Sequence, residues 1–293
     1  MLVTGGSSGT GLALVREAHR LGADIIAGSR SLDRLAEVSD EVGGARFHPF
    51  VADLTDERAV NGQLQALAKR GLRPTDLVHS AAGGLEPVVR QLVRRCVALR
   101  RVPEAQLAAS LESARSEVRQ WVDASREGAM RVNYEAPRTL FDQLAPRLPT
   151  GGSITFYSSL WSTFYAQAEV PGFYRGIAES KLALENWLAS RSAAWAERGI
   201  TTAIISGHIM SDTNMGELID RFLVPFMPAE QQARFRSFYV TTADMVRATI
   251  PVLVNAGHHD ARGRLVRSYV VGPSQIVDHL SADTPALADL IPL

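Results

Sequence analysis

The stretch TGGSSGTG, residues 4–11, is the most informative part of this 293-residue sequence. It follows the apolar run MLV and opens an amphipathic segment, GLALVREAHRLG, at residues 11–22. Glycines in such a connection allow a tight turn and let the backbone approach a bound group closely. The order strand, turn, helix therefore predicts the pyrophosphate-binding turn of a dinucleotide site, with the anion at the helix N-terminus.

Outward from that turn, short apolar runs alternate with longer amphipathic ones. Strand-like runs are DIIAGS, ARFHPFVA, TDLVHSAA, GSITFYS, ITTAIIS and RLVRSYVV, and helical patterns lie between them at 31–42, 56–71, 119–147, 174–198 and 242–255. Crossover connections of this kind put strands in parallel. We therefore predict an α/β fold: a single Rossmann-like domain over residues 1–293, with a doubly wound parallel sheet of about seven strands.

Two segments exceed this minimal plan. Residues 84–128 carry apolar residues at helical spacing and predict a helical insertion after the fourth strand. Its arginines indicate either a solvated helix face or a docking patch for an acidic acyl carrier protein. Residues 211–240 contain the cluster FLVPFM and further aromatic side chains, past the end of a strand. We interpret this second segment as a substrate-binding lid, with a helical oligomer contact as the alternative.

Bulk composition excludes several classes of function. The 31 basic and 31 acidic residues balance, which argues against binding to nucleic acid or to an anionic membrane surface. The sequence shows no charged-then-apolar leader and no apolar run of about 18 residues, so we expect a cytoplasmic protein. One cysteine, Cys96, rules out an intrachain disulfide. The seven histidines form no metal-binding pattern, and for His208 we favour a structural role over one in the cofactor cleft.

The predicted cofactor is NADP(H). The second strand ends in Ser29 and Arg30 without a carboxylate for the adenosine ribose, and a guanidinium suits a 2′-phosphate. Asp53, followed by Leu54, ends the third strand, where it would accept a hydrogen bond from adenine or cap the next helix. In the turn itself, the expected binding residues are Gly5, Ser7, Ser8, Gly9 and Gly11.

Taken together, these residues resemble the short-chain dehydrogenase/reductase family. TGGSSGTG has that family's Thr-Gly-x-x-x-Gly-x-Gly spacing, and HSAAG (79–83), which contains Ala81, stands where the family has Asn-Asn-Ala-Gly. SGHIMSD (206–212) replaces Pro-Gly-x-Ile-x-Thr. The resemblance implies an NADPH-dependent oxidoreductase with Ile209 and Ser211 beside the nicotinamide. It also implies a homo-oligomer built on the long helices.

The stretch FYRGIAESK, residues 173–181, supplies a candidate catalytic pair, Tyr174 and Lys181. Lys181 is one of only two lysines among the 31 basic residues, and an ammonium can lower a tyrosine pKa while it binds ribose hydroxyls. The resemblance adds Ser159, preferred over Ser158, as a hydrogen-bond donor to the substrate oxygen. It also adds Asn133, which would hold a water in a proton relay.

The spacing of this pair departs from the family's four residues. Positions i and i+7 share a helix face but differ by about 10.5 Å of rise, against about 6 Å for i and i+4. A hydroxyl set back in this way suits an enoyl thioester, in which hydride enters at the β carbon and charge develops on the carbonyl oxygen. The pattern resembles the short-chain enoyl reductases that act on acyl-CoA or acyl-carrier-protein thioesters.

Alternatives remain at this point. Position 177, four before the lysine, is isoleucine, so Tyr165, Tyr157 or no tyrosine at all would be the acid if Tyr174 is not. The first functional hypothesis is NADPH-dependent reduction of an enoyl thioester C=C bond. The second is reduction of a bulky ketone metabolite, and the third is a catalytically silent dinucleotide-binding protein.

Overall fold

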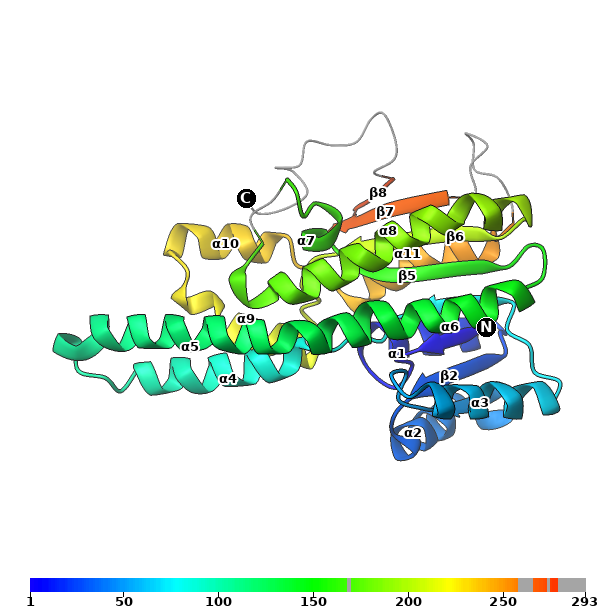
Figure 1. Ribbon diagram of the computed structural model, residues 1–293, viewed down its shortest axis with the longest axis horizontal. Coiled ribbons are helices and arrows are strands. Elements are labelled where there is room, and N and C mark those ends of the chain that lie inside the picture. Colours follow the sequence, from blue (N-terminus) through cyan, green and yellow to red (C-terminus); the bar gives the residue numbers. More distant parts are fainter. Residues whose placement is uncertain (168–169, 258–265, 273–274, 279–293) are drawn as a thin grey trace.

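The protein is built on one mixed sheet in the computed structural model, which describes residues 1–167, 170–257, 266–272 and 275–278 (Figure 1). Within these residues the strand order is β3-β2-β1-β4-β5-β6-β7-β8. β1 to β7 pair in parallel, and β8 adds an antiparallel edge to β7. The predicted doubly wound sheet of about seven strands is confirmed, and β8 is an addition that the sequence did not suggest.

The strands are short and end close to the residues expected from the sequence. They are β1 Leu2–Thr4, β2 Ile25–Ser29, β3 Phe47–Val51, β4 Asp76–His79, β5 Ser153–Ser159, β6 Thr201–Gly207, β7 Val266–Gly272 and β8 Gln275–Asp278.

Helices connect the strands and cover the sheet. The α-helices are α1 Gly9–Arg20, α2 Leu32–Val42, α3 Glu57–Lys69, α4 Leu85–Leu99, α5 Glu104–Met130, α6 Ala136–Leu144, α7 Leu160–Thr163, α8 Arg175–Glu197, α9 Asn214–Phe222, α10 Ala229–Ser237 and α11 Thr242–Val254. A π-helical turn, η2 (Arg131–Glu135), joins α5 to α6. Short 3₁₀ turns are η1 Gly44–Arg46, η3 Ala145–Arg147, η4 Gly172–Tyr174 and η5 Val224–Phe226.

Two apolar clusters hold the layers together. One face of the sheet packs on α3, α6 and α8 through residues such as Leu64, Phe141 and Leu184. The other packs on α1, α2 and α11 through residues such as Leu14 and Met245. Each buried side chain of this size stabilises the fold by about 1.5–3 kcal/mol relative to exposure. The sandwich therefore fixes the carboxyl ends of the parallel strands, where open α/β sheets bind ligands.

A third cluster lies beyond that edge of the sheet. It joins Val89 of α4, Ala129 of α5, Ile177 of α8 and Ile219 of α9. In Figure 1 the α4–α5 pair extends past the sheet, next to α9 and α10. The residues predicted as a helical insertion are α4 and most of α5, and those predicted as a lid are α9, η5 and α10.

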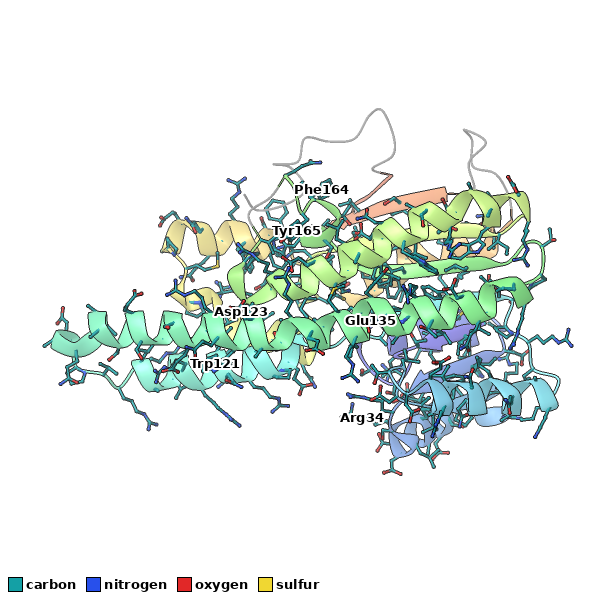
Figure 2. The ribbon with its side chains drawn as sticks, in the orientation of Figure 1. Arg34, Trp121, Asp123, Glu135, Phe164 and Tyr165 are labelled. Carbon is teal, nitrogen blue, oxygen red and sulfur yellow. The ribbon has the colours of Figure 1, made fainter. Side chains whose placement is uncertain are left out.

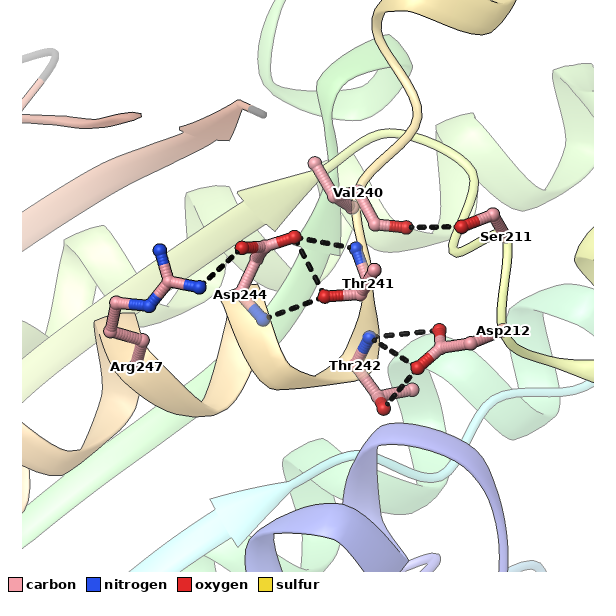
Figure 3. A network of polar contacts seen from close by, with 7 residues as sticks. All are labelled: Ser211, Asp212, Val240, Thr241, Thr242, Asp244 and Arg247. Atoms are coloured by element: carbon pink, nitrogen blue, oxygen red, sulfur yellow. Dashed lines mark hydrogen bonds and ion pairs between the residues drawn. The ribbon is translucent and has the colours of Figure 1, made fainter. Parts of the chain in front are cut away.

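The two ends of segment 211–240 are tied to each other (Figure 3). The Ser211 backbone N–H donates to the Val240 carbonyl at 2.9 Å, and the Val240 N–H donates to the Ile209 carbonyl at 3.1 Å. Asp212, inside the segment, accepts hydrogen bonds through its carboxylate from the Thr242 N–H at 2.9 Å and from the Thr242 hydroxyl at 2.6 Å, two residues beyond the segment's end. The segment is therefore a closed loop with a fixed base.

Among the described residues, no helix is long and apolar enough to cross a membrane. Nor does this part of the chain bring together three or more His, Cys, Asp or Glu side chains in a way that would hold a metal ion.

Candidate functional site

The glycine turn is shaped by close backbone contacts. Gly5 has a φ of +72°, and a Cβ there would lie 2.8 Å from the Ala81 nitrogen. A Cβ on Gly11 would lie 2.3 Å from the Gly5 carbonyl oxygen. Because a real Cβ does not approach this closely, both positions require glycine. The turn thereby holds α1 directly against the ends of β1 and β4.

The start of α1 is suited to an anion. Ser8 is the N-cap residue, but its side chain makes no capping hydrogen bond, and the first turn has no acidic residue. The free N–H groups of a helix N-terminus attract negative charge. Ser7 instead donates to the Ser29 hydroxyl at 2.8 Å, which ties the turn to the end of β2. Uncapped donors beside a turn too tight for side chains fit a pyrophosphate.

Arg30 and Asp53 lie near each other at the adjoining strand ends. Asp53 accepts from the Thr55 N–H at 2.9 Å and from its hydroxyl at 2.7 Å. These bonds lower the pKa of Asp53, with a smaller contribution from the charge of Arg30. The alternative prediction, that Asp53 caps the next helix, is wrong, because Asp56 caps α3. Asp53 and Arg30 are both exposed and open to a ligand.

Asn133 fixes the loop after β4. It lies in the π-helical turn η2 and is 1% exposed. Its Oδ1 accepts from the Gly83 N–H at 2.9 Å, and its Nδ2 donates to the Gly83 carbonyl at 3.1 Å and to Ser180 at 3.0 Å. A buried amide satisfied in this way is a rigid link. It connects α8 to the loop that carries Ala81.

Lys181 is buried beneath the ends of β5. Its Nζ donates to the Tyr157 carbonyl at 2.9 Å and lies 5.5 Å from the centre of the Phe156 ring. Burial lowers its pKa to about 8, while the neighbouring Glu185 opposes that shift. An ammonium has three N–H donors, so the bond to Tyr157 leaves others for ligand hydroxyls.

Tyr174 is the last residue of η4 and the N-cap of α8, so it precedes the regular helix. Its side chain is 9% exposed and packs on Trp161, with ring centres 5.1 Å apart. Burial raises its pKa to about 12, a hydrogen bond from Ser159 opposes the shift, and the charge of Glu185 adds to it. The expected lowering of this pKa by Lys181 is therefore wrong, because burial dominates and the charge that acts here is a carboxylate.

The alternative tyrosines point elsewhere. The Tyr157 hydroxyl is bonded to Thr249 of α11 at 2.7 Å, within the opposite layer. The Tyr165 hydroxyl donates to Glu179 at 2.7 Å; it follows α7, next to Phe164 (Figure 2). Glu179 and Lys181 are two residues apart on α8 and so face directions about 160° apart. Ile177 is packed in the third apolar cluster.

Glu185 was not predicted as a site residue. It is 8% exposed and accepts hydrogen bonds from Ser158 and from Thr163, the latter at 3.1 Å. Burial raises its pKa to about 7, although both hydroxyls and Lys181 oppose the shift. A signal was present: Glu185 follows Lys181 by four residues, which places the two charges on one helix face. Glu185 is the common electrostatic neighbour of Lys181 and Tyr174.

The two serines at the end of β5 have different partners. Ser158 donates to Glu185, whereas Ser159 interacts with Tyr174. The preference for Ser159 over Ser158 as the substrate-binding serine remains a prediction. It agrees with this division, because Ser159 is the one beside the candidate phenol.

The loop after β6 closes over the glycine turn. The Thr10 hydroxyl lies 2.8 Å from the Met210 sulfur, so the turn and this loop are in contact. Ile209 is buried, and Ser211 is exposed with its hydroxyl bonded to the Val240 carbonyl at 3.3 Å. Ser211 also lines a groove of about 490 Å³ together with Tyr239 of the predicted lid.

An aromatic cage surrounds His208, the residue directly after β6. It consists of Trp161, Phe235, Phe238 and Tyr239, with ring centres 4.8, 5.1, 6.2 and 5.9 Å from that of His208. The imidazole is 4% exposed, and neither ring nitrogen has a hydrogen-bond partner in the described part of the chain. Burial lowers its pKa to about 3. An unsatisfied buried polar group costs about 1–3 kcal/mol.

Some arginines of α4 are already paired within the chain. Arg90 pairs with Glu86 at 2.7 Å, and Arg95 pairs with Glu117 of α5. These pairs reduce the net positive charge of this helix face, which favours the interpretation of a solvated face over that of a docking patch for an acidic carrier protein.

Comparison with known proteins gives consistent relatives. Residues 1–222 match the family model described as short chain dehydrogenase. An uncharacterized oxidoreductase of Caenorhabditis elegans is 28% identical over 222 residues, covering 74% of this chain and 61% of that protein. A probable 2,4-dienoyl-CoA reductase of the same organism is 25% identical over 222 residues, covering 74% and 62%. A probable NADP-dependent dehydrogenase of Haemophilus influenzae is 38% identical over 89 residues, covering 29% and 34%. These matches span less than two thirds of each relative.

Solved structures share the fold at low identity. A short-chain dehydrogenase/reductase of Saccharomyces cerevisiae superposes with a TM-score of 0.65 at 21% identity, covering 99% of this chain and 98% of that one. A dehydrogenase/reductase of Sinorhizobium meliloti 1021 gives 0.62 at 20% identity, covering 91% and 92%. Because the family model matches 222 of the 293 residues, from β1 through α9, this chain belongs to the short-chain dehydrogenase/reductase family.

Proposed function

We propose that this protein is an NADPH-dependent oxidoreductase that reduces the C=C bond of enoyl thioesters. The observation that carries this proposal is the pairing of Tyr174 with Ser159 at the end of β5, while Ile177 occupies the position four before Lys181. Tyr174 would then stand further from Lys181 along the chain than the acid of a ketone reductase of this family, which suits a donor to an oxygen remote from the carbon that takes the hydride. The C. elegans relative named as a probable 2,4-dienoyl-CoA reductase is in keeping with thioester chemistry.

The residues present fit NADP(H). The uncapped start of α1 and the glycine turn would bind the pyrophosphate, Arg30 the 2′-phosphate, and Asp53 the adenine amino group. Ala81, Ile209 and Ser211 would line the nicotinamide end of the cleft. When bound, the cofactor supplies hydride, and the protein supplies orientation and charge stabilisation. The H. influenzae relative is named as NADP-dependent, which agrees with this cofactor.

Tyr174 and Ser159 would act on the thioester oxygen. Hydride addition at the β carbon would move negative charge onto that oxygen, two carbons away, and a proton from water would then add to the α carbon and give the saturated thioester. A phenol with a pKa of about 12 stays protonated at neutral pH, so it can donate a hydrogen bond to the developing oxyanion. Donors already oriented in a buried site stabilise such charge more strongly than water does.

Lys181 and Glu185 would set the charge of the cleft. Lys181 would donate to ribose hydroxyls from the position fixed by the Tyr157 carbonyl. Ionised Glu185 would favour the ammonium form of Lys181, whose pKa of about 8 lies near neutral pH. Asn133 would act indirectly, by fixing the loop after β4 against α8.

Segment 211–240 would act as the substrate lid. Its aromatic residue Phe235 packs in the same cluster as Tyr174, so the segment covers the candidate acid. Its joined ends allow it to move as a unit about the 209–212 and 240–242 connections. A substrate therefore reaches Tyr174 only after this segment shifts.

Loss of NADPH absorbance tests the proposal. We expect turnover with crotonyl-type thioesters and little with β-keto thioesters; the reverse preference would identify a ketone reductase. Absence of turnover with both, despite NADPH binding, would indicate a catalytically silent protein.

Two variants test the site. Tyr174→Phe should lower kcat about 10²-fold or more, the size typical of losing one oxyanion donor, with little change in the NADPH Kd. Lys181→Ala should lower both kcat and NADPH affinity. Full activity of Tyr174→Phe would reject Tyr174 as the hydrogen-bond donor.

A further inference from the structure

His208 occupies a position beside the candidate reaction site. It is the first residue after β6, whose last residue, Gly207, is paired with Ser159 at the end of β5. The Trp161 ring contacts both sides, with its centre 4.8 Å from that of His208 and 5.1 Å from that of Tyr174. His208 and Tyr174 thus flank one indole at the edge of the sheet where this fold binds ligands.

The surroundings of His208 do not satisfy its chemistry. A neutral imidazole has one N–H donor and one lone-pair acceptor. Aromatic carbon surrounds the ring, and no described residue donates to or accepts from either nitrogen. An apolar ring such as that of phenylalanine would not carry that unpaired polar group. A buried polar group left unpaired in this way calls for a partner that comes from outside the chain.

The segment that covers His208 is the one proposed to move. Phe235, Phe238 and Tyr239 all belong to segment 211–240, whereas Trp161 belongs to α7, directly after β5. A shift of the segment would uncover the imidazole and leave it on a wall formed by Trp161. A ligand group entering there would meet apolar ring faces, the two imidazole nitrogens of His208 and, on the segment itself, the Tyr239 hydroxyl.

We propose that His208 is a specificity-determining residue that hydrogen-bonds an uncharged oxygen, a hydroxyl or a carbonyl, on the part of the substrate that enters the aromatic cage. The proposal builds on the proposed function, because Tyr174 and Ser159 bind the reacting thioester oxygen and His208 binds a second one. A carboxylate does not suit the cage, since it would lose its hydration among aromatic rings. A plain hydrocarbon chain would leave the imidazole unpaired and so bind less well.

Matched ligand pairs test this inference. The two members of a pair have the same carbon chain, and one of them carries an additional hydroxyl or keto oxygen at its far end. Each pair is prepared once as saturated thioesters and once as free ketones. Binding is measured with NADP⁺ present for wild type, His208→Phe and the control Phe238→Leu, which alters the apolar wall only. We expect wild type to favour the oxygenated member roughly tenfold, His208→Phe to lose this preference, and Phe238→Leu to weaken both members alike.

Two further readouts separate a ligand-binding role from a structural one. The ligand-free His208→Phe protein should melt at the same or a higher temperature than wild type, and its NADPH affinity should be unchanged. A lower melting temperature would overturn the proposal, because the imidazole would then stabilise the fold. The proposal would also be overturned if wild type and His208→Phe showed the same ratio of affinities for the two members of every pair. The same holds if neither protein bound any of these ligands. Failure of the proposed function is a separate result, seen as no turnover of enoyl thioesters by wild type.

Discussion

Glu185→Gln is expected to change stability and turnover in opposite directions. Glu185 has a pKa of about 7 in the folded protein, raised mainly by burial from a reference value of 4.5. Between these values the folded state keeps a proton that the unfolded chain has lost. The stabilisation is therefore complete below pH 4.5 and is lost as the pH rises through about 7. A shift of this size corresponds to at most about 3 kcal/mol.

Glutamine cannot ionise, yet its carbonyl can still accept from Ser158 and Thr163. The free energy of unfolding of the variant should therefore rise relative to that of wild type as the pH rises, by up to about 2.5 kcal/mol between pH 5 and pH 8. Burial lowers the pKa values of His79 and His208 to about 3, so both histidines raise the free energy of unfolding as the pH rises. They do so equally in wild type and in Glu185→Gln, and their contributions cancel when the two proteins are compared.

Turnover should move the other way. Without the carboxylate, the pKa of Lys181 falls below about 8, so the ammonium is partly lost at neutral pH. We expect a lower kcat at pH 8 and a pH optimum displaced to the acid side. Urea unfolding followed by tryptophan fluorescence at pH 5, 6, 7 and 8 measures the first effect, and a kcat profile over the same range measures the second. Glu197→Gln, at the exposed end of the same helix, is the control and should match wild type. A stability difference independent of pH, or an unchanged kcat profile, would refute the reasoning.

Three further changes test the cofactor cleft and the choice of tyrosine. Arg30→Ala should weaken NADPH binding by about 10- to 100-fold, the value of charge-assisted hydrogen bonds, and leave NADH binding nearly unchanged in fluorescence titrations; equal losses would argue against a 2′-phosphate contact. Gly11→Ala places a Cβ 2.3 Å from the Gly5 carbonyl oxygen, so we expect NADPH affinity to fall more than tenfold. Normal affinity in this variant would contradict the assignment of the glycine turn as the pyrophosphate site. Tyr157→Phe removes a buried bond to Thr249 and should cost about 1 kcal/mol in urea unfolding without lowering kcat. A large loss of kcat in that variant would return Tyr157 to the list of candidate acids.

The sheet and the cofactor cleft were predictable because they follow from local patterns. Apolar runs of strand length alternate with amphipathic helices, and the glycine turn needs no knowledge of distant residues. Since parallel strands end at one edge, the residues after β1, β2, β3, β4 and β6 were bound to come together there. The four-residue β8 was missed because so short a run carries too little pattern.

The electrostatics of the site was less predictable, because it depends on burial. The sequence indicated a cation, Lys181, near Tyr174, but it did not show how far Tyr174 is buried. Burial has a larger effect on the pKa of Tyr174 than any neighbouring charge. Tyr157 and Tyr174 were separable only in three dimensions, because only the packing shows that the Tyr157 hydroxyl bonds Thr249 of α11 whereas Tyr174 lies beside Ser159. Glu185 was overlooked because a helical glutamate is ordinarily solvated. α8 instead buries residues around most of its circumference, from Ile177 to Leu188.

The fate of deuterium from NADPH labelled at C4 of the nicotinamide tests the proposed reaction most directly. Wild-type protein is incubated with the labelled cofactor and an enoyl thioester, and the product is examined by NMR. We expect a saturated thioester with deuterium on the β carbon. Two results together would contradict C=C reduction. The enoyl thioester would be recovered without label, and a β-keto thioester supplied instead would give a β-hydroxy product with deuterium on the carbinol carbon.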